Sequence, residues 1–309
     1  TTEIYTLSLH DALPIFKEAY FNLLRAREDQ SVAAETVALY EAQLRQAEAF
    51  YRAGSSSKID VTTAEVNLSQ ARLDLAKARS SASTAVAVLE NEIGTRLPDR
   101  QAALETPREA PLPVPGLEEA QSEALAARPD VLAGGERVLS AREALAATAK
   151  GLSPSLYASG GYGFSDSSSG WEDEWTAGVS LSIPLYDGGA TAARTEAARA
   201  ELEISRSDLE KLRNTVRLEV STALLDLETA SAQVKTAETA LRQAEENLRL
   251  AQGRYRVGVG TSLEVTDASE KYSTARKTLV QARYDLQVAG AALVKALGRP
   301  VEIRKEDAK

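Results

Sequence analysis

Apolar residues recur along the second half of the chain at steps that alternate between three and four residues. This spacing is the heptad of a coiled coil, and every second position is alanine. The first run consists of Val220, Ala223, Leu227, Ala230, Val234, Ala237, Leu241, Ala244, Leu248, Ala251 and Tyr255, and the second of Ala268, Tyr272, Ala275, Leu279, Ala282, Leu286, Ala289 and Leu293. Between the runs, Gly258 and Gly260 allow the chain to reverse, and Thr261 can cap the returning helix. The pattern therefore predicts a long antiparallel helical hairpin with its tip at this loop.

The same pattern occurs a second time, earlier in the chain. An offset of 204 residues carries Arg52 onto Arg256, Gly54 onto Gly258 and Ser57 onto Thr261. The helical heptads on both sides of the loop also match, including most of the alanine positions. Two unrelated coiled coils would share the period but not the loop residues, so we infer an internal duplication.

The positions of glycine and proline predict where the remaining helices and the domains begin and end. We expect helices at about 16–53, 59–93, 117–127, 131–150 and 190–252, and a final helix that ends at Gly298. Asp130 is the expected cap of the helix that follows Arg128 and Pro129. The predicted domains are 16–94 (the C-terminal part of repeat 1), a proline-rich linker at 95–116, repeat 2 at 117–298 and a charged tail at 299–309.

Between residues 155 and 186 the apolar residues recur at every second position. Two segments of about ten residues alternate apolar with small or polar side chains, and a serine-rich loop at 165–173 joins them. The proposed membrane-facing positions are Leu156, Tyr162, Phe164, Trp175, Val179, Leu181 and Ile183. Such strands have the length of a barrel strand that crosses a bilayer. A soluble hairpin packed on helices fits these residues equally well. Trp171 and Trp175 flank the strand region and suit the headgroup level of a bilayer or ordinary core or loop positions equally well.

Composition narrows the function further. The net charge of −9 and the absence of a basic stripe argue against nucleic-acid binding. The sequence has no cysteine, no nucleophile–histidine pair, no phosphate-binding glycine loop and no cluster of metal ligands, so we expect neither catalysis nor a cofactor. The sequence contains no run of 18 consecutive apolar residues, so we expect no transmembrane helix.

Residues 1–15 differ from the rest because they lack the alanine heptad. They have no basic start and no small-residue cleavage site, so they are not a signal peptide. We interpret them as a non-native leader, similar to a translated sequencing adapter fused to a truncated reading frame. On that interpretation His10, the single histidine, has no biological role.

Three motifs carry a family resemblance. They are Arg-Tyr-x-x-Gly-x-x-Thr-x-Leu-Glu-Val-x-x-Ala at 254–268, Val-Ser-Leu-Ser-Ile-Pro-Leu-Tyr-Asp-Gly-Gly at 179–189, and Arg128-Pro-Asp130. With the duplication, they resemble the TolC-like outer-membrane efflux proteins over about residues 16–300. The resemblance implies a mainly α fold of long antiparallel coiled-coil hairpins that form a periplasmic α-barrel, plus strands of a trimeric outer-membrane β-barrel.

The resemblance also implies partners. The expected assembly is a homotrimer in outer-membrane lipid, with helical tips that meet a periplasmic adaptor and, through it, an inner-membrane pump or secretion ATPase. The expected function is a passive exit duct. A periplasmic adaptor or coiled-coil scaffold is the alternative, although an adaptor would normally carry one hairpin and not two.

Particular residues follow from the resemblance. Tyr255, Glu264 and Asp267 correspond to a periplasmic gate, in which a ring of carboxylates would attract cations. Glu264 and Asp267 are equally explained as acidic residues that favour a helix N-terminus. The expected adaptor-docking tips are Arg52, Gly54, Ser55, Ser56, Ser57, Arg256, Gly258, Val259, Gly260 and Thr261. Gly260 departs from the family, which often has a basic or polar residue there.

The first repeat begins only at the helix that leads into its tip. Three copies of this chain would supply six strands where the family pattern needs twelve. We therefore expect that this chain, which lacks a signal peptide and the first strand pair, does not form a sealed channel by itself.

Overall fold

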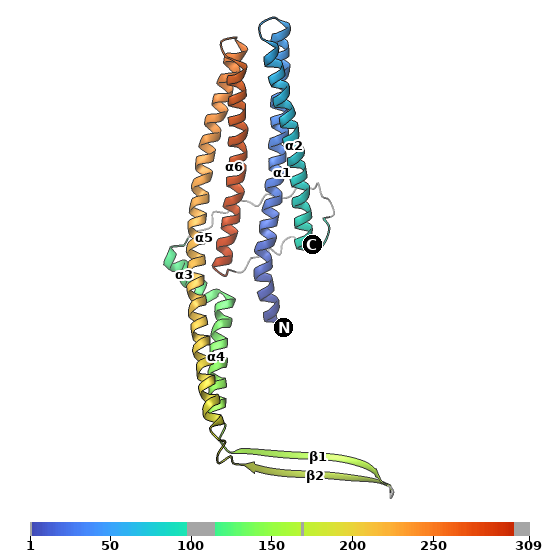
Figure 1. Cartoon of the computed structure of the whole chain (residues 1–309), viewed down its shortest axis with the longest axis vertical. Coiled ribbons are helices and arrows are strands. Elements are labelled where there is room, and N and C mark those ends of the chain that lie inside the picture. Colours follow the sequence, from blue (N-terminus) through green and yellow to red (C-terminus); the bar gives the residue numbers. More distant parts are fainter. Residues whose placement is uncertain (1, 98–114, 168–169, 300–309) are drawn as a thin grey trace, which may run out of the picture. The chain divides into compact units, whose positions relative to one another are not determined.

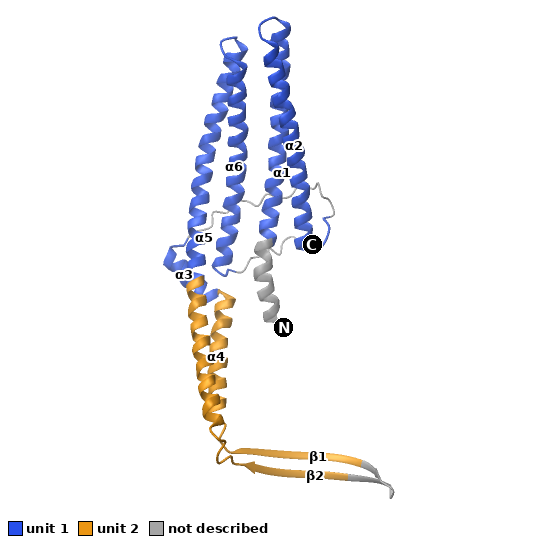
Figure 2. Ribbon diagram, in the orientation of Figure 1, with its two compact units in different colours: residues 1–127, 216–309 blue, residues 128–215 orange. Residues whose placement is uncertain are grey.

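The computed structural model describes residues 2–97, 115–167 and 170–299, with backbone only for 2–15, 165–167 and 170–173. The chain forms two compact units, one of residues 1–127 and 216–309 and the other of residues 128–215 (Figure 2). The first unit contains both helical hairpins and the second contains the strands. The charged tail at 300–309 and most of the proline-rich linker lie outside the described residues.

The first hairpin consists of α1 (Thr2–Arg52) and α2 (Lys58–Ile93). A buried seam joins them, with Leu23 packed against Val86 and Leu89, and Tyr40 packed against Leu68. α1 begins at Thr2, earlier than the predicted start at residue 16, because a helical backbone satisfies its own hydrogen bonds whether or not the heptad continues. The interpretation of residues 1–15 as a non-native leader stays a prediction.

The second hairpin pairs the end of α5 (Ala190–Arg256) with α6 (Ser262–Ala296). Its buried seam again follows the predicted heptad, as in the cluster of Leu248, Ala251 and Tyr255 with residues of α6. α5 continues past the expected end at residue 252, because Gly253 does not interrupt the hydrogen-bond ladder. Figure 1 shows the four rods of this unit in the order α5, α6, α1, α2.

Both tips turn by the same backbone motif. Gly54 and Gly258 adopt left-handed φ angles of 73° and 76°. Their amides donate to Tyr51 O (3.0 Å) and Tyr255 O (3.1 Å), and the next residue bonds one carbonyl further back in each case. These are the paired bonds of a Schellman motif, which requires glycine at the left-handed position.

α3 (Leu117–Ala127) packs on the second hairpin. Gln121 Nε2 donates to Ser221 Oγ of α5 at 3.0 Å. Arg299, just after α6, makes a bidentate pair with Glu123 at 2.6 and 2.8 Å. This pair lowers the pKa of the Glu123 carboxyl. The carboxylate therefore stays charged, and α6 stays tied to α3, down to a lower pH than usual.

In the second unit, α4 (Pro129–Ala149) packs on the beginning of α5. The N-cap of α4 is Arg128, with Pro129 at the first helical position, so the prediction that Asp130 is the cap is wrong. Proline takes that place because its fixed φ already suits the first turn. Asp130 instead accepts two hydrogen bonds from Arg128, at 3.1 and 2.7 Å.

β1 (Ser155–Ser167) and β2 (Gly170–Ser182) form a two-stranded antiparallel sheet. The predicted loop at 165–173 is wrong in large part, because both strands run into it and pair there through their backbones, whatever the side chains. β2 ends at Ser182, so Ile183 lies outside the strand in which it was predicted. Pro184 follows directly and has no N–H to continue the ladder.

Candidate functional site

The two hairpins meet where α6 packs along the first hairpin, and near the tips part of this contact is polar. One row of α6, at steps of three and four residues, presents hydroxyl groups to α1 and α2. The bonds join Ser262 to Asp60 (2.6 Å), Thr266 to Asn67 (3.4 Å), Ser269 to Gln43 and Ser273 to Thr36 (3.3 Å). Ser269 is fully buried in this row. We refer to these contacts as the polar seam.

Further from the tips the same contact becomes apolar. Phe21, Leu24 and Val32 of α1 form one buried cluster with Val280 and Tyr284 of α6. Burial and the nearby Glu28 carboxylate raise the pKa of Tyr284 to about 12. Burying one such side chain stabilises by about 1.5–3 kcal/mol, whereas a neutral hydrogen bond contributes about 1 kcal/mol net. Apolar side chains also join the hairpins near the tips, where Leu39 and Phe50 of α1 pack against the cluster that contains Tyr255.

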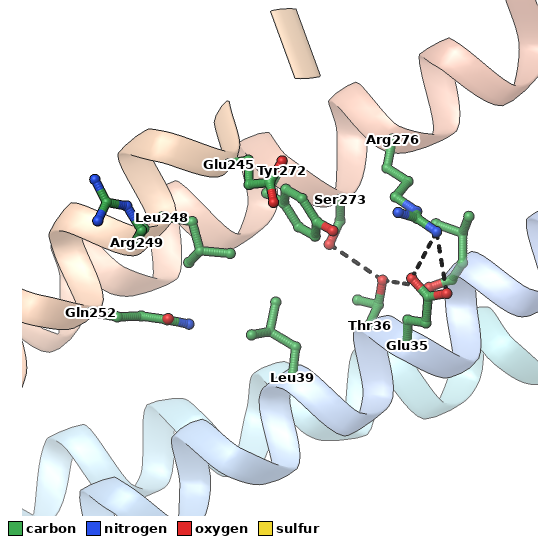
Figure 3. Close-up of a pocket in the computed structure, with 11 residues that line it drawn as sticks. Glu35, Thr36, Leu39, Glu245, Leu248, Arg249, Gln252, Tyr272, Ser273 and Arg276 are labelled. Atoms are coloured by element: carbon green, nitrogen blue, oxygen red, sulfur yellow. Dashed lines mark hydrogen bonds and ion pairs between the residues drawn. The ribbon is translucent and has the colours of Figure 1, made fainter. Parts of the chain in front are cut away.

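A cavity of about 460 Å³ lies where the polar and apolar parts meet, between α1, α5 and α6. Figure 3 shows Leu39, Leu248 and Tyr272 along its walls, and the ion pair between Glu35 and Arg276, at 3.1 Å, at one end. Its wall mixes apolar side chains with charged ones, of which Glu35, Arg276 and Arg249 are already paired. This arrangement offers space within the contact but no convergent set of free catalytic groups.

Tyr255, predicted as a gate residue, lies in the contact between the two tips. Its side chain is only 9% exposed and its ring packs edge to face on Phe50 of α1, with centroids 5.1 Å apart. Burial raises the pKa of Tyr255, and the neighbouring Asp60 carboxylate adds to the effect. Among the described residues its hydroxyl has no hydrogen-bond partner. It lines a narrow space together with Asp60 and Ser262.

Asp60 also joins the tips, although no pattern in the sequence singled it out. One carboxylate oxygen accepts from Ser262 Oγ of the other hairpin, and the other accepts from the Ser57 amide at 3.2 Å. The bond from Ser262 is the largest cause that lowers the pKa of Asp60. The signal that could have found it is its position three residues after the Ser57 cap, where a capping-box acid is expected.

Glu264 and Asp267 lie in the first turns of α6, as predicted, but each has a basic partner in the same hairpin. Glu264 pairs with Arg254 at 3.4 Å, and Asp267 pairs with Lys271 at 2.7 Å. The Glu264 amide donates to Thr261 Oγ1 at 3.2 Å, so Thr261 is the helix cap that the sequence predicted. The spacing of Asp267 and Lys271 could have revealed that pair, whereas Arg254 is brought in by the turn.

Gly260 stands where a side chain would collide with the end of α5. A Cβ atom there would lie 3.0 Å from Arg254 Cβ and 3.0 Å from the Tyr255 amide nitrogen. A side chain at this position would therefore crowd the backbone at the end of α5. Arg254 supplies the positive charge near Glu264 instead.

The predicted docking residues are exposed at the two tips, apart from Ser56 and Gly260, which are partly buried. Four large apolar side chains project beside them. These are Ile59, Val257, Val259 and Leu263, and each is at least 67% exposed. Of these four, only Val259 was predicted as a docking residue. The other three apolar residues would ordinarily be assigned to a core.

The predicted membrane-facing side chains of β1 and β2 are exposed. The register places Leu156 opposite Leu181, Ala158 opposite Val179, and Tyr162 opposite Trp175, which is 78% exposed. Small and polar residues such as Ser159 and Ser180 occupy the other face. The sheet thus has one apolar and one mainly polar face.

Among the residues that the structure describes, no group of three or more His, Cys, Asp or Glu side chains could hold a metal ion. None of the helices found there is both long enough and apolar enough to cross a membrane.

The fold is shared with the open-state MtrE outer membrane channel of Neisseria gonorrhoeae, with a TM-score of 0.80 and 23% identity over 94% of this chain and 66% of that one. The family model described as outer membrane efflux protein matches residues 15–95 and 120–299. The chain belongs to this family, and the resemblance predicted from its motifs is confirmed.

Two curated relatives have similar sequences. Outer membrane efflux protein BepC of Brucella suis is 30% identical over 91% of this chain, and outer membrane protein TolC of Vibrio cholerae is 28% identical over 91% of it. The chain spans 62% and 66% of the lengths of these two relatives.

Proposed function

We propose that the chain forms part of the wall of a passive outer-membrane efflux channel, the exit duct of a tripartite efflux or type I secretion system. The observation that carries this proposal is the family match across both hairpins and the strand pair together. The one-sided sheet supports it, because an isolated strand pair with a fully exposed apolar face requires lipid or further strands to cover that face.

The helical hairpins form the periplasmic part of the duct. Three copies build a hollow α-barrel, and the wall performs no chemistry of its own, since energy comes from an inner-membrane pump. The exposed tips dock a periplasmic adaptor. Their apolar side chains Ile59, Val257 and Leu263 suit the end of a helical hairpin, which can cover them on contact.

The tips also form the gate. Tyr255 and Asp60 lie in the contact between the hairpins. Opening there would separate the ring contact of Tyr255 with Phe50 and the bonds of the polar seam, which water can replace. Glu264 and Asp267 set the charge at the entrance, partly balanced by Arg254 and Lys271.

Negative-stain electron microscopy of the detergent-extracted chain tests the duct. We expect heat-modifiable trimers whose end views have a stain-filled centre. Solid bundles of fixed size, or a soluble hairpin protein without oligomers, would contradict the proposal and favour a scaffold.

The gate is tested by replacing Glu264 with Gln and Asp267 with Asn in a channel that also contains the first strand pair, reconstituted in planar bilayers, because this chain is not expected to form a sealed channel by itself. Reduced block by divalent cations is expected because two carboxylates per protomer are lost. Unchanged block and unchanged conductance would remove these residues from the gate.

A further inference from the structure

The cavity between α1, α5 and α6 has an apolar interior. Val32 of α1 and Leu248 of α5 are buried in its wall, and Leu39 of α1 and Tyr272 of α6 are partly buried there. Figure 3 shows the side chains of Leu39 and Leu248 directed into the space from α1 and α5. The volume of about 460 Å³ lies within the range of about 300–1,000 Å³ that small-molecule sites occupy. The cavity is therefore large enough for the apolar body of an organic molecule.

The charges around this interior are not fully balanced. Two guanidinium groups line it, and both are already neutralised, because Arg276 pairs with Glu35 at 3.1 Å and Arg249 pairs with Glu246 at 2.6 Å. Figure 3 also shows the Arg249 side chain directed away from the space. The Glu245 side chain lines the same wall and makes no ion pair or hydrogen bond with any residue that the structure describes. The wall therefore offers an unpaired carboxylate to a ligand, and no unpaired cation.

An aromatic ring contributes to the same wall. Tyr272 lines the cavity from α6 and Glu245 lines it from α5. An ammonium group is attracted both to a carboxylate and to the face of an aromatic ring, and quaternary ammonium ligands are often recognised in this way. An anionic ligand would instead be repelled by Glu245. The chemistry of the wall thus favours a positively charged ligand.

We propose that this cavity binds a lipophilic organic cation, a molecule with an aromatic or branched apolar body and one ammonium group. The apolar body lies against Leu39 and Leu248, and the ammonium group lies near Glu245 and the Tyr272 ring. This inference goes beyond the proposed duct. It does not depend on the assembly of several copies, because every residue that lines the cavity belongs to one chain.

The position of the cavity gives the ligand a structural effect. A bound cation contacts α1 of the first hairpin on one side, and α5 and α6 of the second hairpin on the other. It therefore binds best where the two hairpins lie together, and its binding free energy stabilises that arrangement. The site is a place where a small molecule strengthens the contact between the hairpins.

The test uses three compounds of nearly equal size and different charge. The probe is (2-naphthylmethyl)trimethylammonium. Its neutral carbon isostere is 2-neopentylnaphthalene, and its anionic counterpart is 2-naphthylmethylphosphonate. A ligand of about 15 non-hydrogen atoms should bind with a dissociation constant of about 0.1–1 mM. We expect the cation to bind most tightly, the neutral isostere more weakly and the phosphonate not at all.

A fluorine label in the cavity reports occupancy in the folded, detergent-extracted full chain. The chain contains no cysteine, so a trifluoromethyl group attached to Gln252→Cys is the single label. Gln252 lies at one end of the cavity in Figure 3, opposite Glu35. Binding should shift the fluorine NMR signal and saturate, whereas partition of a compound into detergent gives no saturation at this label.

Variants of the wall test the assigned roles. Glu245→Gln should weaken binding of the cation about two- to fivefold and leave the neutral isostere unaffected. Glu228→Gln is the matched control, because it removes the same charge from an exposed position of α5 outside the cavity, and it should change nothing. Tyr272→Leu should also weaken binding of the cation about two- to fivefold, whereas Tyr272→Phe keeps the ring and should retain most of the affinity.

Three results would overturn the inference: no saturable shift with the cation, equal binding of all three compounds, or equal weakening by Glu228→Gln and Glu245→Gln. Hollow trimers seen by microscopy together with any of these results would leave the duct standing and refute only the ligand site. A saturable shift that is selective for the cation, in a chain that forms no hollow trimers, would refute the duct and keep the site.

Discussion

Replacing Asp60 with alanine should loosen the link between the two tips. Its carboxylate accepts the 2.6 Å bond from Ser262 of the opposite hairpin and also holds the amide of Ser57. A hydrogen bond to a charged group contributes about 1.5–3 kcal/mol net. Because Asp60 is only partly buried, water replaces part of this, and we expect a loss of about 1 kcal/mol. That corresponds to about a fivefold rise in the separated population.

The distance between the tips can be measured directly. Nitroxide labels at Ser55→Cys and Val259→Cys, both exposed, report it by double electron–electron resonance in a chain that has no other cysteine. The Asp60→Ala variant should give a broader distribution with a longer mean distance. Asp74→Ala is the matched control, because Asp74 lies on the same helix and its ion pair is with Lys77.

A double-mutant cycle separates this link from general loosening. Ser262→Ala should reproduce the effect of Asp60→Ala, and the two changes together should add little more. The link should also respond to acid, because the pKa of Asp60 is lowered in the folded chain. Its contribution is complete above the unfolded value of about 4 and is lost as the pH falls through the lower folded value. An unchanged distribution in Asp60→Ala, or an equal change in Asp74→Ala, would refute the reasoning.

Three further outcomes are expected. Leu23→Ala should lower the free energy of unfolding in urea by about 2–5 kcal/mol because this fully buried side chain leaves a cavity, whereas exposed Leu152→Ala should change it by less than about 0.5 kcal/mol. Thr261→Ala should destabilise the start of α6 by about 1 kcal/mol through loss of its cap, seen as faster amide exchange there. Val179→Lys should reduce flotation with liposomes, because the charge enters the apolar face, and Ser180→Lys on the opposite face should not.

The helical hairpins could be predicted from the sequence because burial repeats with the period of the helix. Positions such as Leu23 and Leu248 appear in the heptad, and both are buried where it places them. The strand ends could not be predicted in the same way. Backbone pairing extended β1 and β2 into the serine-rich stretch, where side chains carry no alternating signal.

No local sequence pattern predicts the link between the tips. Asp60 and Ser262 are about two hundred residues apart, and neither the heptad nor the turn chemistry relates them. Arg254 was missed as the partner of Glu264 for a similar reason, since the turn at Gly258 brings it there. Tyr255 was selected from the family resemblance, and its burial between the tips is visible only in three dimensions.

The pairing of β1 with β2 limits how this chain can vary in length. Because Leu156 stands opposite Leu181 and Tyr162 opposite Trp175, side chains alternate between faces along both strands. Inserting or deleting one residue within β2 would move every later side chain of that strand to the other face. Tolerated changes of length in the strands should therefore come in even numbers, whereas single-residue changes belong in the connection between them.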